Sequence, residues 1–329
     1  MYAAKRLIKD IGSDPQIAKT LKKEPLSKNR TGEPVRDEPS LTYVIARKNC
    51  CIYRNPHDRS GADFAPLNGS RGVLVEMTRK TAPSGSTPAG ALDKYLSTIR
   101  KRFSVSHEEE ALLTSEMAGD AYFSAGDVIV AEGEAIDFSS LLFEGMSYRE
   151  KSTVDGNSQI VGLHIPGDFV DLHSYPLKKL DHSLIALTDC RLVTLPHERI
   201  DRLMHESPPL ARILWFSTMA DASIHREWIL NLGSRRGSAR IGHLFCEMYC
   251  RMTIVGLVKD DSFAFPLTQH QLGDALGFTQ IHVNRILREL REANLAVFNN
   301  GRVTIKDFDR LAKHSGFEPD YLFVSRRTA

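Results

Sequence analysis

Hydrophobic side chains recur at helical spacing in two neighbouring segments near the end of the chain. The first segment, "QHQLGDAL", follows Thr268, and a glutamine three residues later completes a capping box that satisfies first-turn amides. Gly277 suits the left-handed backbone that ends a helix, and Thr279 caps the next one. The apolar side of this second helix consists of Val283, Ile286, Leu287 and Leu290. The pattern predicts two helices joined by a tight turn.

The flanking segments complete a winged helix-turn-helix layout. Upstream, a helix is predicted from a stripe with helical spacing that comprises Ile241, Leu244, Phe245, Met248, Tyr249 and Met252. Downstream, "LAVFNNGRVTI" predicts a hairpin, because Asn300-Gly301 favours a tight turn between two strand-like runs. A short closing helix is expected to begin near Asp307.

The outward side of the second helix carries groups that form hydrogen bonds with base edges. Arginine binds guanine O6 and N7, asparagine or glutamine binds adenine, and an apolar group contacts the thymine methyl. A solvated surface is the alternative interpretation, but long Lys and Glu side chains are usual there, and neither occurs in this helix before Glu289. Arg302, beside the hairpin tip, is expected to contact a phosphate. The predicted DNA contacts are Thr268, Gln269, Thr279, Gln280, Ile281, His282, Asn284, Arg285, Arg288 and Arg302.

The middle of the chain shows short strand-like runs separated by turn residues. Two helices are expected first, in "ALDKYLSTIRKRF" and "HEEEALLTSEM". The strand-like runs that follow are broken at Gly126-Asp127, Gly133, Gly145, Asp155-Gly156 and Gly167-Asp168. This spacing is typical of an antiparallel barrel or roll.

A long helix is predicted over residues 207–232. Ser207 can cap it, and Pro208 and Pro209 suit its first turn. Steps of three and four residues define a seam that suits pairing with a second copy of the helix. The residues expected at this dimer interface are Leu210, Leu214, Ser217, Ile224 and Trp228, with Asp221 on the same seam. An ordinary core helix is the alternative interpretation.

Residues 1–90 differ from the rest of the chain. They are rich in Lys, Arg, Pro, Ser and Gly and contain one strand-like run, "LTYVIARKNCCIY", so they are expected to be mostly disordered. A later start of translation, for example at Met77, is the alternative explanation. The expected organisation is α+β: a disordered extension (1–90), an antiparallel β-roll (91–206), a long dimerisation helix (207–233) and a winged helix-turn-helix domain (234–329).

Composition excludes several classes of protein. The chain has 329 residues and a net charge of only +2, so a basic surface must be local. Five cysteines without a disulfide framework favour a reducing cytoplasm, and no apolar run is long enough to cross a bilayer. His243, Cys246 and Cys250 have a spacing that could share a metal, but a fourth ligand is missing, so no metal or cofactor is expected. No catalytic motif occurs, and an enzyme is not expected.

From about residue 91 to 329 the chain resembles the Crp–Fnr family of bacterial transcription regulators. "FTQIHVNRILREL" is similar to the family's recognition helix, with Arg285 at its base-contacting arginine. "DVIVAEGE", "LLFEG" and "PGDFVDL" resemble its jelly-roll sensor domain, which is related to cyclic-nucleotide-binding folds. The resemblance implies a homodimer on double-stranded DNA, contact with RNA polymerase and a small-molecule effector of unknown identity. A ligand- or redox-sensing module in which DNA binding is secondary is the alternative function.

Departures from the family pattern concern the effector and the operator. The resemblance places an effector pocket at Gly167, Asp168, Phe169, Asp171, His182 and Ser183. Members that bind cyclic AMP carry Gly-Glu where this chain has Val170-Asp171, and an arginine where it has Asp181-His182 before Ser183. A carboxylate there would repel a cyclic phosphate, so no strong response to cyclic nucleotides is expected. Cys50-Cys51 and Cys190 lack the spacing of the family's iron–sulfur cluster. Gln280 and Ile281 replace the Arg-Glu of the cyclic-AMP regulator, which predicts a different half-site.

Overall fold

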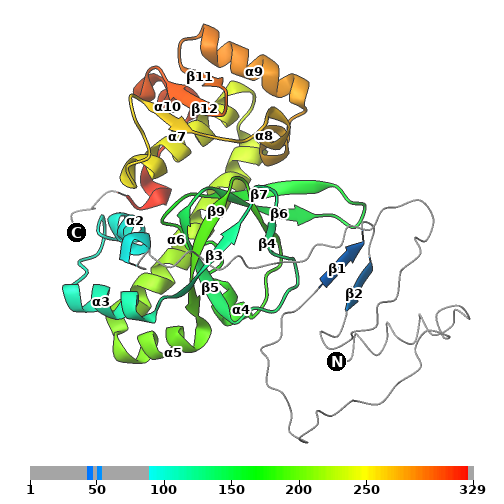
Figure 1. Ribbon diagram of the computed structural model, residues 1–329. Coiled ribbons are helices and arrows are strands. Elements are labelled where there is room, and N and C mark those ends of the chain that lie inside the picture. Colours follow the sequence, from blue (N-terminus) through cyan, green and yellow to red (C-terminus); the bar gives the residue numbers. More distant parts are fainter. Residues whose placement is uncertain (1–42, 47–49, 54–88, 325–329) are drawn as a thin grey trace, which may run out of the picture. The chain divides into compact units, whose positions relative to one another are not determined.

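The computed structural model describes residues 43–46, 50–53 and 89–324, in two compact units divided after Thr78 (Figure 1). In the first unit, strands β1 (Tyr43–Ala46) and β2 (Cys50–Tyr53) pair antiparallel. The sequence predicted a single strand-like run at this place. Most of the segment predicted to be disordered lies outside the described residues.

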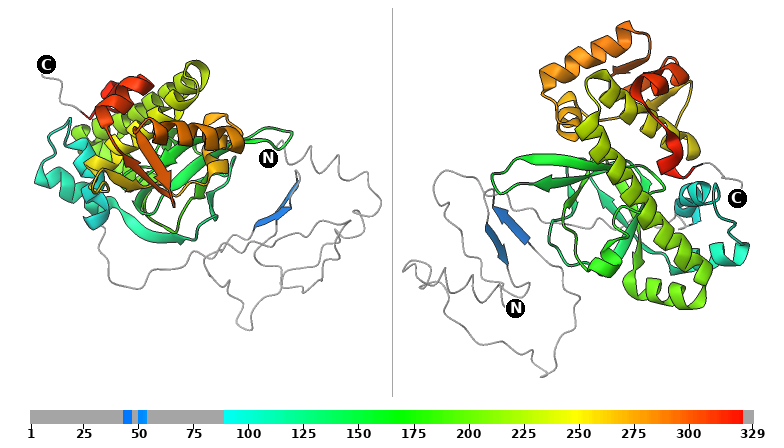
Figure 2. Two further views of the ribbon diagram at one scale, coloured as in Figure 1. Left: turned by 90° about the horizontal axis from the view of Figure 1, so that it is seen from above. Right: turned by 180° about the vertical axis from the view of Figure 1, so that it is seen from behind.

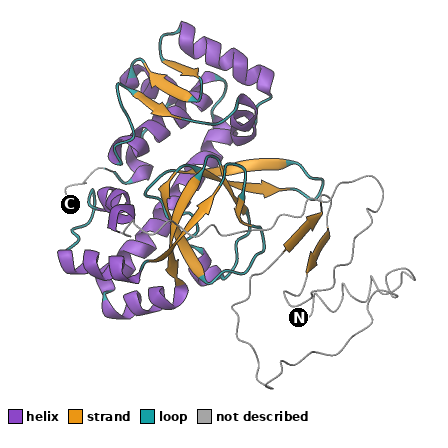
Figure 3. Ribbon diagram, viewed as in Figure 1, coloured by secondary structure: helices purple, strands orange, loops and turns teal. Residues whose placement is uncertain are grey.

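The second unit begins with helices α2 (Ala89–Ile99) and α3 (His107–Glu116), which precede an antiparallel roll (Figures 1 and 3). The roll consists of two sheets with strand orders β3-β9-β5 and β4-β8-β6-β7. Their strands are β3 (Ala118–Phe123), β4 (Val128–Val130), β5 (Phe138–Glu144), β6 (Ser147–Ser152), β7 (Ser158–His164), β8 (Ser183–Ala186) and β9 (Cys190–Pro196). Two helices belong to the roll, α4 (Ser174–Leu177) and α5 (His197–Glu206). Apolar residues of both sheets, among them Leu142, Leu184 and Leu192, form the core between them.

Helix α6 (Pro208–Ser234) connects the roll to the C-terminal domain (Figure 2). The Ser207 hydroxyl accepts a hydrogen bond from the amide of Leu210, and proline occupies the first turn, as expected from the sequence. At 1.5 Å per residue this helix is about 40 Å long. Along the described parts of the chain, no helix is both long enough and apolar enough to cross a membrane.

The C-terminal domain has the predicted winged helix-turn-helix layout. Its helices are α7 (Ser238–Ile254), α8 (Gln269–Leu276), α9 (Gln280–Glu292) and α10 (Phe308–Ser315), followed by the 3-10 turn η1 (Pro319–Leu322). The wing is a sheet with strand order β10-β12-β11, made by β10 (Ser262–Ala264), β11 (Ala296–Asn299) and β12 (Arg302–Ile305). Sequence analysis predicted β11 and β12 but missed the three-residue β10. The predicted stripes of α7 and α9 meet in one core, where Ile241, Phe245, Val283 and Ile286 are fully buried.

The turn between α8 and α9 depends on two glycines. Thr268 and Gln271 form the predicted capping box, and Gly277 ends α8 with a φ of 67°. Gly273 lies inside α8, where a Cβ would stand 2.4 Å from the carbonyl oxygen of Phe278. The second helix can therefore approach the first only because residue 273 has no side chain.

Substitution Gly273→Ala should lower the free energy of unfolding by about 1–3 kcal/mol, because the backbone of the turn must shift to admit a methyl group. Gly233→Ala is the control, since a Cβ there meets no atom within 4 Å. It should be neutral or stabilising by about 0.5–1 kcal/mol, because alanine favours the helix. Urea denaturation followed by circular dichroism measures both, and equal stability of the two variants would contradict this account of the turn.

Candidate nucleic-acid interface

Helix α9 presents its polar side to solvent. Val283, Ile286 and Leu290 are buried, whereas Ile281, an apolar residue, is 84% exposed. Exposed polar side chains on the same side of the helix are Gln280, Asn284, Arg285 and Arg288. An exposed apolar side chain among amides and guanidinium groups fits the base-contacting surface that the sequence predicts. We call Gln280, Ile281, Asn284, Arg285 and Arg288 the reading face.

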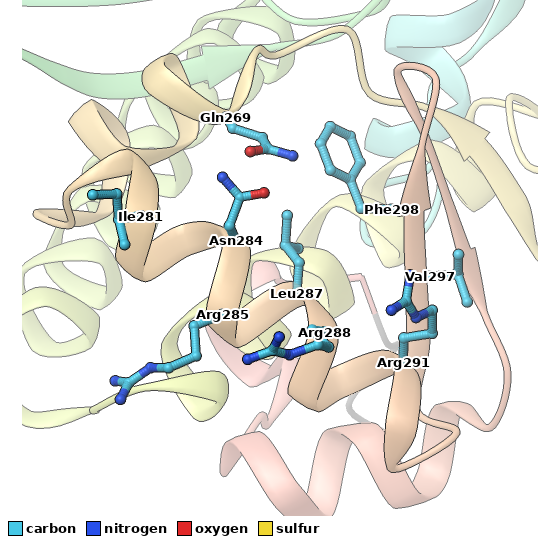
Figure 4. A pocket seen from close by; sticks show the side chains of 9 residues that line it. All are labelled: Gln269, Ile281, Asn284, Arg285, Leu287, Arg288, Arg291, Val297 and Phe298. Carbon is cyan, nitrogen blue, oxygen red and sulfur yellow. The ribbon is translucent and has the colours of Figure 1, made fainter.

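The reading face borders a hollow of about 550 Å³ between α8, α9 and the wing (Figure 4). Gln269 of α8 and Asn284 of α9 point toward each other across its rim. The hollow is lined by Gln269, Ile281, Asn284, Arg285, Leu287, Arg288, Arg291, Val297 and Phe298. Sequence reasoning missed Arg291, Val297 and Phe298. Arg291 stands three residues after Arg288, so helical periodicity alone could have found it.

The positive charge of this surface is weakly compensated. Arg285 Nε lies 3.7 Å from a carboxylate oxygen of Glu289, and Arg288 Nε lies 4.0 Å from one of Glu292. Exposed pairs at such separations contribute at most about 1 kcal/mol each. Phosphate groups can therefore displace these carboxylates, and a negatively charged duplex is an appropriate partner.

Three other predicted DNA contacts also lie in this domain, and two of them cap its helices. The hydroxyl oxygens of Thr268 and Thr279 accept hydrogen bonds from the amides of Gln271 and His282, so both threonines cap helices. Arg302 is exposed at the start of β12, opposite Asn299, as its expected phosphate contact requires.

The residues of the predicted effector pocket fall into two groups, which are joined by the contact between the His173 and His182 rings at 5.2 Å. Gly167, Asp168 and Phe169 line a cavity of about 110 Å³ bordered by α2, α6 and α7. Asp171 and His182 are buried but do not line this cavity, and the Ser183 hydroxyl accepts a hydrogen bond from the amide of Glu132. A single effector pocket at these residues therefore stays a prediction. Strand β6 places a large buried side chain against this region, where it is hydrogen-bonded to Val170.

That side chain is Arg149, which is 1% exposed. Its Nε and Nη2 donate to the carbonyl oxygen of Val170 at 3.2 and 2.6 Å, and its Nη1 donates to Asp221 of α6 at 2.7 Å. Burial raises the pKa of the neighbouring Asp171 to about 7 and lowers the pKa of His173 to about 3. Sequence reasoning did not identify Arg149, because its partners lie far along the chain. The guanidinium group joins the loop before α4 to the long helix.

The predicted dimer seam faces the protomer's own core, which corrects that assignment. Leu210 and Leu214 are at most 5% exposed and pack in a cluster with α2 and α5. The Ser217 hydroxyl is hydrogen-bonded to Tyr95 at 3.0 Å, and the Trp228 indole donates to Glu247 of α7. Ile224 is half-buried against the core of the C-terminal domain. For these residues the alternative interpretation, an ordinary core helix, is the one that fits.

His243, Cys246 and Cys250 do not form a metal-binding arrangement. Within the described ranges, no group of three or more His, Cys, Asp or Glu side chains is arranged to hold a metal ion. Burial raises the pKa of Cys250 to about 11 and that of Cys246 further, so both are thiols at neutral pH.

Comparisons with known proteins agree with this architecture. The family model of the cyclic nucleotide-binding domain matches residues 121–207, and that of the Crp-like helix-turn-helix domain matches residues 239–314. The chain is 26% identical over 202 residues to the transcriptional activator protein FnrL of Cereibacter sphaeroides, which covers 60% of this chain and 81% of FnrL. It is 24% identical over 187 residues to the nitrogen fixation regulation protein FixK of Bradyrhizobium diazoefficiens, covering 56% and 77%.

A solved structure shows the same fold. The structure of FixK2 from Bradyrhizobium japonicum superposes with a TM-score of 0.55 at 21% identity, covering 65% of this chain and 99% of that one. Both family models match in the order of the roll and the winged helix, on either side of α6. The chain therefore combines a cyclic nucleotide-binding-like roll with a Crp-like helix-turn-helix domain, and over both it is similar to transcription regulators of the Crp–Fnr type.

Proposed function

We propose that the protein regulates transcription as a homodimer in which each α9 reads one half of a two-fold-symmetric DNA site. The observation that carries this proposal is an apolar stripe on α6, on the side opposite the face buried in the protomer. A two-fold site requires two reading helices held about one turn of DNA apart, ~34 Å. A single winged helix cannot set that distance, so a rigid element must pair with its own copy.

The stripe has the spacing of a coiled coil. Trp215, Met219 and Ile229 are 69%, 49% and 70% exposed, and Ala222 lies between them on the same side. With Arg226, their positions advance in alternating steps of four and three residues, which is a heptad pattern. The stem of an arginine can cover apolar surface while its guanidinium stays in water. Apolar side chains of this size in a continuous row favour burial against a second α6.

Base reading is proposed for four residues of the reading face, and phosphate contacts for Arg288 of that face and for residues around it. Arg285 is proposed to bind a guanine, Gln280 and Asn284 to bind adenines, and Ile281 to contact a thymine methyl. Arg288, Gln269 and Arg302 are proposed to lie at the phosphates, together with Arg291 from the hollow.

The names of two relatives are the basis for proposing several partners. FnrL is named a transcriptional activator and FixK a regulation protein, so we propose that this protein acts in the cytoplasm on promoter DNA and contacts RNA polymerase. An effector, if one is bound, would enter the cavity at Gly167, Asp168 and Phe169.

The alternative function is a ligand- or redox-sensing module in which DNA binding is secondary, and its redox part has less support. Burial raises the pKa of Cys190 and of Cys250 to about 11. Redox sensors use accessible cysteines of low pKa, because the thiolate is the reactive form.

Replacement of Arg285 by alanine should cost about 1–3 kcal/mol of specific binding and relax the preference at one guanine in each half-site. Arg302→Ala should instead weaken binding to all sequences and reduce the salt dependence, because a phosphate contact carries no sequence information. Competition binding with each half-site guanine replaced in turn distinguishes the two variants. If Arg285→Ala keeps the selectivity of the unaltered protein, Arg285 does not read a base.

Replacement of Trp215 and Ile229 by aspartate should yield a monomer, since each new carboxylate would meet its own copy across the two-fold axis. The variant should lose tight binding to a full operator but keep weak non-specific binding, because phosphate contacts are local. The matched control is Met204→Asp, which alters a 44% exposed apolar residue on α5, away from the stripe. Sedimentation and gel-shift assays measure both properties, and a double variant that remains dimeric would refute this interface.

A further inference from the structure

We propose that His282 is a positioning residue that sets the orientation of the Arg285 guanidinium for base reading. This inference rests on the proposed function, because it concerns how Arg285 meets a base. It stands on one geometric feature of the turn: three side chains are stacked and linked in the order Arg240, Phe278 and His282, and the last of them contacts Arg285.

The imidazole of His282 lies flat on the turn between α8 and α9. Its ring centroid is 4.7 Å from that of Phe278, and the two planes differ by only 2°. The side chains belong to positions i and i+4, so the stack spans the step from the turn into the first turn of α9. An imidazole parallel to a phenyl ring at this distance has little freedom to rotate about its side-chain bonds.

Phe278 is itself held by Arg240 of α7, whose guanidinium carbon lies 4.7 Å from the centre of the phenyl ring. The same guanidinium group donates to the carbonyl oxygens of Leu276 at 2.8 Å and of Leu232 at 2.7 Å. It therefore joins the end of α8 and the end of α6 and fixes the surface on which Phe278 rests.

At its other edge, His282 contacts Arg285. Arg285 Nη2 lies 3.4 Å from His282 Nε2, and the arginine must be the donor because a guanidinium has no acceptor. The carboxylate of Glu289 lies on the C-terminal side of the same guanidinium, 3.7 Å from Nε. The exposed Arg285 is thus restrained mainly by the acceptor one turn before it, because its pairing with the carboxylate one turn after it is weak. This restraint reduces the rotamer freedom that the arginine would otherwise lose on binding a base.

Two other roles of His282 would have different effects on affinity, stability and base preference. A phosphate contact by the imidazole would affect binding to every sequence equally. A purely structural role in the turn would lower stability without changing the preference for guanine. A positioning role changes the preference at the base read by Arg285, and only while Arg285 is present.

A double-mutant cycle on the intact protein tests the proposal. The variants are His282→Leu, Arg285→Ala and their combination, and the quantity measured is the ratio of affinities for the operator with guanine and with adenine at the position read by Arg285. His282→Leu should reduce this ratio about threefold to tenfold, as expected for coupling between contacting residues. In the Arg285→Ala background the same substitution should leave the ratio unchanged.

Three further variants act as controls. His282→Gln keeps an acceptor at the end of the side chain and should retain part of the preference. Phe278→Leu keeps apolar bulk but removes the flat surface, so it should reduce the ratio in the same direction as His282→Leu. His270→Leu, which alters an exposed histidine on α8, should leave the ratio unchanged. Thermal unfolding of each variant confirms that the domain is folded.

The possible outcomes separate the two proposals. If Arg285→Ala leaves the ratio unchanged, the base-reading role of Arg285 in the proposed function fails. If Arg285→Ala abolishes the preference but His282→Leu does not alter it, the proposed function survives and the positioning role of His282 is refuted. An equal loss of affinity for both operators in His282→Leu, additive with Arg285→Ala, also refutes it and assigns His282 to a phosphate.

Discussion

Helix α6 buries one face in its own protomer along its whole length, and the other features depend on that constraint. Near its start, Leu210 and Leu214 belong to a core shared with α2 and α5. At its centre, Asp221 accepts a hydrogen bond from Arg149 of the roll, and near its end Trp228 packs against α7. Because the same rigid helix enters both cores, its remaining face points outward as a continuous stripe, and the proposed dimer has a defined axis.

Buried charges connect the roll to the C-terminal domain. Arg251 of α7 donates to Asp168 at 2.6 Å and to the carbonyl oxygen of Leu163 at 3.1 Å, both in or beside the loop that follows β7. It also pairs with Glu247, whose carboxylate is fully buried and accepts hydrogen bonds from Trp228 and Tyr321. Burial raises the pKa of Glu247. Removing one member of such a network would leave a buried charge without its partner. The network therefore favours this one packing of α7 against the roll.

The C-terminal domain could be predicted from sequence because its signals are local. Capping at Thr268 and Thr279, the turn at Gly277 and the apolar period of α9 involve residues a few positions apart. The proposed dimer interface on α6 could not be assigned in the same way. A helix that contacts two partners has two apolar stripes, and periodicity alone does not say which one, Leu214 or Trp215, faces the protomer's own core. The contacts of Arg149 connect residues 21 and 72 positions away, and no local pattern signals them.

The central claim is that two copies of α9, held by paired α6 helices, read a symmetric site. Genome-wide mapping of the DNA bound by the protein tests it most directly, because the enriched sequence reports both the half-site and its spacing. The account predicts an inverted repeat with a guanine in each half and half-site centres about one helical turn apart, ~10 base pairs. Enrichment of an unpaired half-site, or of no sequence at all, would contradict it.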